Sequence, residues 1–410
     1  KKVGIGPLGS ASVNSTSTVA SQDSPAGQPG SFRQLHGIQS LGMTTTFNLE
    51  QTFELGQLAI YENIEGIPDV SVDIEKVLDG YCPVYLLATE VNSTSTKTDF
   101  LSTSATLVGR SNAKCDLCVA IFKDTGEIAY DPDAGTASEA GARIEQPETH
   151  VMMSGLFVNS VSYNVGIDGY ATESVTLVGQ DKVWHGVANA NGTVTLQNRR
   201  AHWDPTDRIT AEDEPLALTQ GSGGVNRRED VMFSYPGNGA PAAQAPNYAR
   251  DKNGAVSGLG TVLPIEIPGI SASGTNEKSG DTFNSHIQSI SCSTDLGRED
   301  IFELGRKGRY HRFVSFPTEV TCEITVISTS GDLISATEAG FADTANQGNL
   351  TDQTIRLQLR EGLLVDLGKK NKLSSVSITG GDAGGGNEEI TYSYTNFNDM
   401  TVFHPQDPNY

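Results

Sequence analysis

The chain contains one segment twice, and this repeat limits the possible folds more than any other feature. "FELGQLAIYENIEGIP" occupies residues 53–68, and "FELGRKGRYHRFVSFP" occupies residues 302–317. Around them, residues 38–68 align on residues 287–317 without a gap at an offset of 249, and 11 of the 31 pairs are identical. Composition alone would give about two identities. Together with the length of 410 residues, the repeat predicts two related domains in one chain.

Both copies continue into segments that alternate apolar and polar residues. "VSVDIEKV" (residues 70–77) matches "VTCEITVI" (residues 320–327), and such alternation is typical of half-buried strands. Further on, residues 158–178 match residues 373–393 at an offset of 215. Each of these segments predicts a β-hairpin around a turn rich in Gly and Asp.

One short helix is predicted in each copy, between the strand and the hairpin. "DGYCPVYLLATE" (residues 79–90) places Pro83 near a first helical turn. "STSGDLISATEAG" (residues 328–340) offers Ser330 as a cap and Gly340 as a stop. We therefore expect a mainly β chain of two tandem β-sandwich or barrel-like domains, each with one short helix.

Composition divides the chain into four parts. Residues 1–34 are rich in Ser, Thr, Gly and Pro and predict an extended N-terminal arm without a signal-peptide core. Residues 35–184 form the first predicted domain and residues 286–410 the second. Residues 185–285 are rich in turn-forming residues and are interpreted as a long connector. We expect the arm and the connector to become ordered by packing on neighbouring subunits.

Charge and cysteine content exclude several classes of protein. The net charge of −22 argues against non-specific nucleic-acid binding, which needs basic patches. The five cysteines are scattered and odd in number, which fits folding in a reducing compartment. No apolar run reaches the length of about 18 residues that a membrane-spanning helix needs, so we expect no membrane partner.

Four short motifs resemble chemical sites, and each lacks a necessary part. "GGDAGGGN" (residues 380–387) has no Gly-Lys-Ser/Thr and precedes a strand, so we interpret it as a hairpin tip. "CDLC" (residues 115–118) has no second ligand pair for zinc and predicts core cysteines. "HWDPTDR" (residues 202–208) has no nucleophile elbow, and "DPDAG" (residues 131–135) has too few oxygens for calcium. We expect no enzyme activity, metal or cofactor.

The polar positions of the predicted strands and hairpins share a composition. They carry hydroxyls and carboxylates and almost no Lys or Arg, because Lys76 falls on the apolar register. The candidate polar-face residues are Asp73, Glu75, Ser160, Ser162, Ser174, Thr176, Glu323, Ser375, Ser377, Glu389 and Thr391. Such a face suits a wet, anionic surface, which could be an ordinary outer sheet or the wall of a channel.

The order of these elements resembles the tail-tube (major tail) proteins of tailed phages and related viruses. The resemblance is carried by "FELG", a Tyr and a Pro, followed by an alternating strand, a short helix and a Gly-rich hairpin, with residues 370–403 similar to the hairpin of such virion proteins. It covers about residues 38–184 and 286–403. It implies β-sandwich or barrel-like domains that join six to a ring, with the rings stacked into a hollow tube for genome delivery.

Two domains in one chain depart from that pattern and suggest three chains per ring, with pseudo-sixfold symmetry. Under the resemblance the polar face lines the lumen, and viral DNA passes without specific binding. The repeated positions expected at contacts between domains or rings are Glu54, Gly56, Pro68, Glu303, Gly305 and Pro317.

The resemblance also implies partners and a location. The partners are further copies of the chain and other tail proteins, such as a terminator, a baseplate or tip, and a sheath. The protein would be made in the host cytoplasm and reside in the virion tail. Two other classes remain open. One is another virion shell component, such as a sheath or decoration protein. The other is a host-binding adhesin, which would call for the clustered aromatic residues that this sequence lacks.

Overall fold

The fold is mainly β, as predicted. The computed structural model describes residues 2–8, 33–53, 55, 60–79, 81–89, 106–121, 149–186, 225–228, 231–232, 286–305, 308–327, 352–353, 355–359, 363–380 and 388–403. Within these ranges the helices are α1 (Val84–Ala88) and α3 (Leu107–Arg110). Helix α1 follows Pro83, as expected, whereas the helix predicted in residues 328–340 lies outside the described residues.

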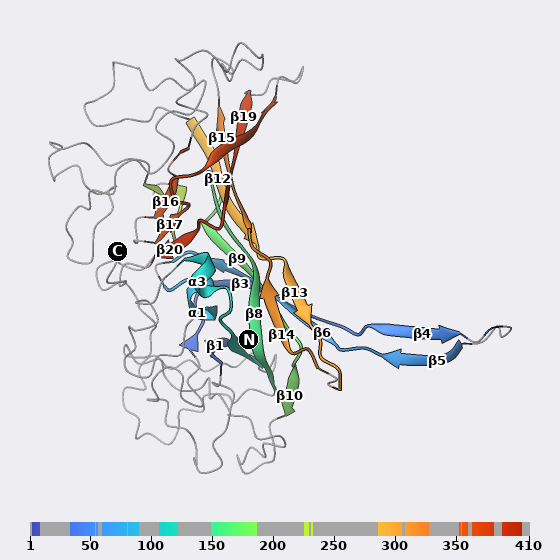
Figure 1. Ribbon diagram of the computed structural model, residues 1–410. Helices are drawn as coiled ribbons and strands as arrows, with labels where there is room; N and C mark the ends of the chain where they lie inside the picture. The colour runs from blue at the N-terminus through green and yellow to red at the C-terminus, as the bar shows by residue number, and fades with distance from the viewer. Residues whose placement is uncertain are drawn as a thin grey trace, which may run out of the picture.

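Eight antiparallel strands of a twelve-stranded sheet form the long wall of the molecule, which can be followed in Figure 1. Its order is β3-β6-β9-β8-β12-β15-β19-β18. The strands are β3 (Ile38–Thr46), β6 (Asp69–Val77), β9 (Thr172–Gly179), β8 (Thr149–Gly166), β12 (His286–Asp295), β15 (Glu319–Ile327), β19 (Glu389–Phe397) and β18 (Lys372–Thr379). The first four come from the first copy of the repeat and the last four from the second.

The two sets of four strands have the same order and the same pairing registers. The register shifts also fall at matching places, namely Ile38/Ser40 and Ile287/Ser289, and Val158/Ser160 and Leu373/Ser375. The second hairpin has a longer turn, so Leu177 and Tyr394 are equivalent at a separation of 217 residues. The ungapped offset of 215 was therefore wrong by two residues in this strand. Its faces stay the same because side chains alternate with a period of two.

A second layer covers the apolar face of this wall. Beside the first set the order is β1-β7-β8-β10, and beside the second it is β11-β16-β17-β20. These strands are β1 (Lys2–Pro7), β7 (Cys115–Ile121), β10 (Val183–Gly186), β11 (Val231–Met232), β16 (Arg356–Leu359), β17 (Leu364–Asp366) and β20 (Thr401–Phe403), and the short β2 (Arg33–Gln34) pairs with β1. One continuous core lies between the layers.

Strand β8 belongs to both layers and bends between them. Its first part pairs with β7 and β10, and its second part pairs with β9 and β12. Between the two parts Gly155 has φ +71°, a conformation that glycine adopts at little cost. The buried carboxylate of Asp116 holds the bend by accepting hydrogen bonds from the Ser154 hydroxyl (2.8 Å) and the Gly155 N–H (3.0 Å).

A buried carboxylate anchors helix α1 to the wall. The N–H groups of Val84 and Tyr85 donate to Glu173 at 2.7 and 3.0 Å, and the Tyr163 hydroxyl donates to it at 2.9 Å. Unpaired N–H groups at a helix start favour such an acceptor. Burial raises the pKa of Glu173 above its ordinary value, and the two backbone hydrogen bonds oppose this shift.

Short parts of the N-terminal segment and of the connector pack within the chain. Residues 2–7 form β1, and Val3 and Ile5 are core residues. Residues 3–7 are all buried, because β1 lies between β2 and β7, and the composition of residues 1–34 as a whole concealed this strand. In the connector, Val231 pairs with β16, and the side chain of buried Asn226 donates to the Leu78 carbonyl at 3.0 Å.

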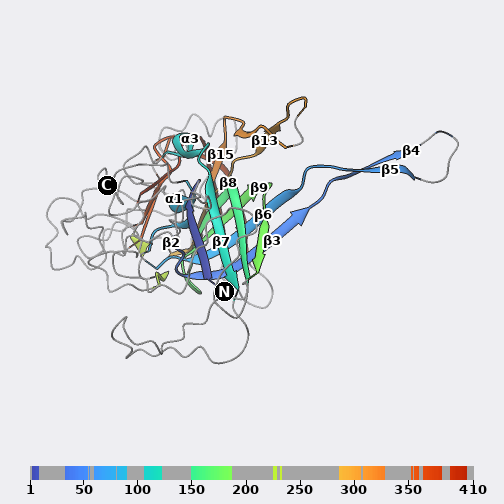
Figure 2. The ribbon, with the colours of Figure 1, turned by 90° about the horizontal axis from the view of Figure 1, so that it is seen from below.

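Two hairpin arms leave the wall at equivalent points. The first consists of β4 (Leu49–Phe53) and β5 (Ile60–Glu65), and the second of β13 (Arg298–Ile301) and β14 (His311–Val314). Leu49 pairs with Glu65, and the equivalent Arg298 pairs with Val314, so the registers agree. The β4–β5 arm extends far from the body, whereas the β13–β14 arm stays close to it (Figures 1 and 2).

Candidate functional site: an acidic sheet face, two unpaired edges and an arm clamp

The face of the eight-stranded sheet turned away from the core is polar. It carries all the candidate residues predicted from the sequence: Asp73, Glu75, Ser160, Ser162, Ser174, Thr176, Glu323, Ser375, Ser377, Glu389 and Thr391. Each of them is exposed or half-buried. The pairing brings them into cross-strand rows, such as Asp73 opposite Thr176 and Glu323 opposite Ser393. The sequence thus placed these residues on one face, but the face is continuous over both copies.

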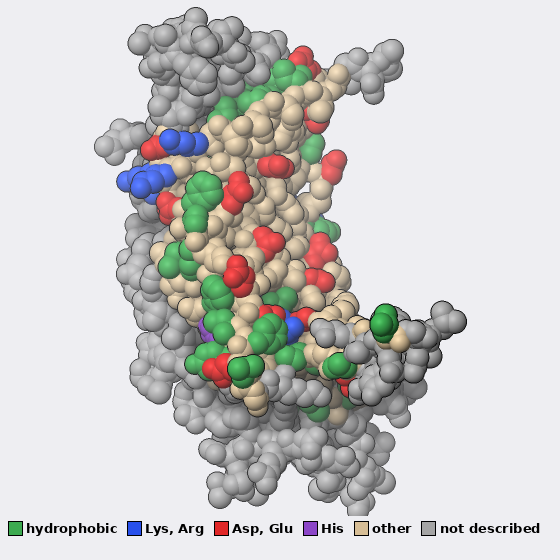
Figure 3. All heavy atoms as spheres, turned by 45° about the vertical axis from the view of Figure 1, so that its right-hand side comes forward, with side chains coloured by type: hydrophobic (Ala, Val, Ile, Leu, Met, Phe, Trp, Pro, Cys, Tyr) green, Lys and Arg blue, Asp and Glu red, His purple; other side chains and the backbone are tan. Residues whose placement is uncertain are grey.

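Cross-strand hydrogen bonds tie hydroxyls to the carboxylates of this face. Thr176 donates to Asp73 at 2.8 Å, and Ser40 donates to Glu75 at 3.2 Å. Asp and Glu side chains are spread over this side of the molecule, while Lys and Arg lie mainly near one margin (Figure 3). Among the described strand positions of the face, Lys372 at the start of β18 is the one basic side chain. Lys76 is buried on the opposite face, as predicted.

The two four-strand sets meet where β8 pairs with β12. The pairing runs from Ser289 opposite Gly166 to Asp295 opposite Ser160. On the core side, Val161, Tyr163 and Val165 of β8 are buried against Ile290 and Cys292 of β12. The last strand of one set therefore joins the first strand of the next.

The outer strands β3 and β18 are paired on one side only within the described part of the chain. Strand β3 is the equivalent of β12, and β18 is the equivalent of β8. Each therefore presents the kind of edge that is paired at the internal junction, but without a neighbouring strand among the described residues. Tyr163 is fully buried at the internal junction, whereas its equivalent Ile378 is 50% exposed. Leu41 and Met43, the equivalents of Ile290 and Cys292, are only partly buried.

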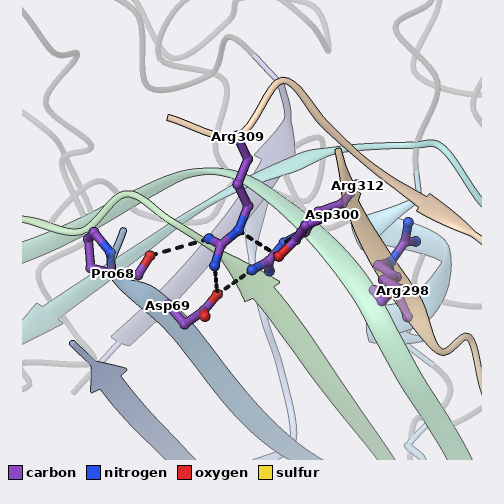
Figure 4. Close-up of polar contacts among 7 residues, drawn as sticks. Pro68, Asp69, Arg298, Asp300, Arg309 and Arg312 are labelled. Atoms are coloured by element: carbon purple, nitrogen blue, oxygen red, sulfur yellow. Dashed lines mark hydrogen bonds and ion pairs between the residues drawn. The ribbon is translucent and has the colours of Figure 1, made fainter. Parts of the chain in front are cut away.

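A clamp of two arginines and two aspartates holds the β13–β14 arm to the first set (Figure 4). Arg309 lies 2.7 Å from Asp69 and 2.6 Å from Asp300. Arg312 lies 2.6 Å from Asp300 and also contacts Asp69. Arg309 further donates to the Pro68 carbonyl at 3.4 Å. Both guanidinium groups are nearly buried, so loss of one carboxylate would leave a poorly compensated charge.

Arg298 adds a second contact between the β13–β14 arm and residues of the first half of the chain. It donates to the carbonyls of Val158 and Ser111, both at 2.6 Å, and its guanidinium lies 4.6 Å from the centre of the Phe157 ring. Burial lowers the pKa of Arg298 to about 10, with a further contribution from Arg312, so the side chain remains charged at neutral pH.

The predicted contact residues have mixed positions. The carbonyl of Pro68, in the first copy of the repeat, accepts a hydrogen bond from Arg309 in the second copy. Pro68 therefore lies at a contact between the two copies within the chain. Pro317, Glu303 and Gly305 are exposed, and Gly305 has φ +82° near the tip of its arm. Glu54 and Gly56 lie outside the described residues.

Sequence reasoning missed the clamp. Its arginines stand at positions where the first copy has Ile60 and Asn63, so a search for shared residues could not find them. The sequence nevertheless contained a signal, because these two positions are basic in the second copy of the repeat and uncharged in the first.

The other motifs contribute no site within the described ranges. Cys115 and Cys118 are buried on β7 in separate apolar clusters, as expected for core cysteines. The segments "HWDPTDR", "DPDAG" and most of "GGDAGGGN" lie outside those ranges. Where the chain is described, no three metal-binding side chains come together, and no helix is long and apolar enough to cross a bilayer.

No protein-family model and no curated protein matches this chain.

Proposed function

We propose that this chain is a virion structural protein of the tail-tube class, and that three copies close a ring through pairing of β18 with β3 of the next copy. The observation that carries the proposal is the internal β8–β12 junction. It joins two equivalent four-strand sets head to tail, and among the described residues no strand pairs with the matching edges at the two ends. A heterologous contact closes a ring when its rotation divides a full turn evenly, and otherwise it generates an open helix.

The register of the internal junction predicts the register between chains. At the internal junction Cys292 is opposite Tyr163, so Met43 should be opposite Ile378 in the next chain. Ser293 is opposite Ser162, so Thr44 should be opposite Ser377. Backbone pairing would satisfy two sheet edges that otherwise invite uncontrolled association. The same contact would cover the half-exposed apolar side chains at each edge.

The size of the resulting ring suits the passage of DNA. Three chains with eight strands each make a barrel of 24 strands. At a spacing of about 4.8 Å and a tilt of about 40°, its lumen is roughly 40 Å wide after side chains are placed. A DNA duplex with a diameter of about 20 Å would pass.

The composition of the polar face supports the same proposal. With the core on the outside of the barrel wall, this face would line the lumen with hydroxyls and carboxylates. Phosphates would be repelled, and few basic groups would hold them. The proposed role is therefore genome delivery, with other tail proteins at the tube ends and DNA as a passing cargo.

Cross-linking tests ring closure. The double variant Thr44→Cys/Ser377→Cys should form covalent trimers on mild oxidation, because these exposed positions would be opposite each other in neighbouring chains. The five native cysteines are buried and should give little background. Each single variant should remain uncross-linked, and negative-stain images should show hollow rings or tubes. Monomers alone, or closed rings of six chains, would refute the proposal.

A further inference from the structure

We propose that the base of the β4–β5 arm docks on the β18–β19 end of a second copy of this chain, and that exposed apolar side chains of the arm take part there in place of the arginine clamp of the internal contact. The inference rests on the ring closure proposed above. Its template is the β13–β14 arm, which crosses the β8–β12 junction and packs on the preceding strand set. Because the two arms share their register, each contact residue of one has a defined equivalent in the other.

The template arm is covered at its base by the neighbouring set. Leu296 is 2% exposed, and its N–H donates to the Asn159 carbonyl at 2.7 Å. Arg309, Arg312 and Val314 are buried as well. These positions face the first set, so they would be open to solvent if that set were absent.

In the β4–β5 arm, the positions equivalent to Leu296 and Arg298 are exposed to solvent. Phe47, the equivalent of Leu296, is 68% exposed, and Leu49, the equivalent of Arg298, is 60% exposed. Two large apolar side chains within three positions are an unusual surface for a chain with a net charge of −22. Their equivalents are the residues that the neighbour covers, so the partner expected to cover them is a further copy of the chain.

The complementary surface lies at the other end of the same chain. Asn159 and Gln180, which lie beside the template arm, have Ser374 and Phe397 as their equivalents. Phe397 is 60% exposed, and Phe316, next to the equivalent of Pro68, is also exposed. Phe397 thus adds an apolar side chain where the internal junction has Gln180, whereas Phe157, which packs on Arg298 in the template, has Lys372 as its equivalent.

The ionic clamp is only half present at this second contact. Asp69 has Glu319 as its equivalent, but Arg309 and Arg312 are replaced by Ile60 and Asn63. A carboxylate is therefore retained without the guanidinium groups that pair with it in the template. Because apolar contacts are insensitive to salt and ion pairs are screened, the contact between chains should respond to salt less than the internal one.

The test measures the protein concentration at which half of the chains are in rings. The double variant Phe47→Ser/Leu49→Ser should raise this concentration by about tenfold or more, because it removes two large apolar side chains from the contact. Its unfolding transition should not change, since both side chains are exposed in the single chain. Val108→Ser, on the exposed side of α3, is the matched control and should change neither quantity.

A second variant tests the orientation by building the missing half of the clamp. Ile60→Arg/Asn63→Arg should lower the half-assembly concentration at low salt by several fold, and adding Glu319→Gln should cancel the gain. An unchanged half-assembly concentration in the Phe47→Ser/Leu49→Ser protein would overturn the docking. So would a gain from the arginines that survives Glu319→Gln.

The edge cross-link distinguishes failure of this inference from failure of the ring itself. If Thr44→Cys/Ser377→Cys still gives trimers while the arm variants have no effect on assembly, the ring stands and the docking is wrong. If the arm variants shorten tubes without changing the half-assembly concentration of rings, the arm contacts an adjacent ring instead. If the edge cross-link never forms, both proposals fail.

Discussion

At the scale of the residue, the most constrained side chain is Glu173. It accepts two hydrogen bonds from the start of α1 and one from Tyr163, and it has no exposure to solvent. Its carboxylate is costly to ionise because burial disfavours the charged form. The same residue links the helix, strand β9 and strand β8, so its protonation affects the contact between these three elements.

The raised pKa of Glu173 gives a stability that depends on pH. Below the ordinary value of 4.5, the carboxyl is neutral in both the folded and the unfolded chain. As the pH rises above it, the unfolded chain loses its proton first, so the free energy of unfolding falls until the folded-state pKa is passed. Glu173→Gln lacks this loss. Relative to wild type, the variant should therefore gain stability from pH 4 to pH 7.

Urea unfolding across this pH range measures the difference, and groups shared by the two proteins cancel in it. Glu173→Ala serves as a further comparison, because it leaves the helix N–H groups without an acceptor and should cost about 1–3 kcal/mol at each pH. If the difference in free energy of unfolding between wild type and Glu173→Gln did not change with pH, or changed in the opposite direction, the raised pKa of Glu173 would be contradicted.

At the scale of the element, β1 shows how a short strand can be hidden by the composition around it. It lies between β2 and β7 and contributes Val3 and Ile5 to the core. Its position matches that of β11 beside β16, so each four-strand set has a covering layer that contains an equivalent of β1. The segment therefore contributes to folding, whatever part residues further along play in assembly.

Two neighbouring substitutions distinguish a core strand from a free arm. Ile5→Ala should lower the free energy of unfolding by about 2–5 kcal/mol, because a buried aliphatic side chain leaves a cavity. Leu8→Ala, at the exposed end of the same segment, should cost less than about 1 kcal/mol. Denaturant unfolding of the two variants gives both values. Equal, small effects would show that residues 2–7 do not pack on the core.

At the scale of the whole molecule, the carboxylates of the polar face would act together in the proposed tube, because each chain in it would present the same face. Each Lys or Arg in a channel wall would hold a phosphate of passing DNA and release counterions, and many copies would act on one duplex. In the proposed ring, fusion of two sets in one chain would make one of every two contacts intramolecular, which would raise its effective concentration.

Reversal of charge tests the channel. Asp73→Lys with Glu323→Lys should change stability by under about 0.5 kcal/mol for each exposed site, and tubes should still form. Ejection of DNA from virions that carry both changes should be slower, with the largest effect at low salt, where screening is weakest. Ser174→Asn, a neutral change on the same face at an inner strand, is the control. Normal ejection rates by the doubly substituted virions at low salt would place the DNA path elsewhere.

The sequence by itself determined the strands and their faces. Alternation with a period of two decides which side chains of "VSVDIEKV" and "VTCEITVI" face the core, and an error of two residues in aligning β19 left its faces unchanged. Local rules also predicted that a helix begins after Pro83 and that the cysteines of β7 are buried.

Only the tertiary structure decided how the two sets join. The pairing of β8 with β12 links residues that are far apart in the chain, and no local pattern specifies a strand's neighbour in a sheet. The clamp of Arg309 and Arg312 on Asp69 depends on that junction, because it brings the second arm over the first set. Contacts between remote segments are set by how complete surfaces fit, and a linear pattern does not contain that information.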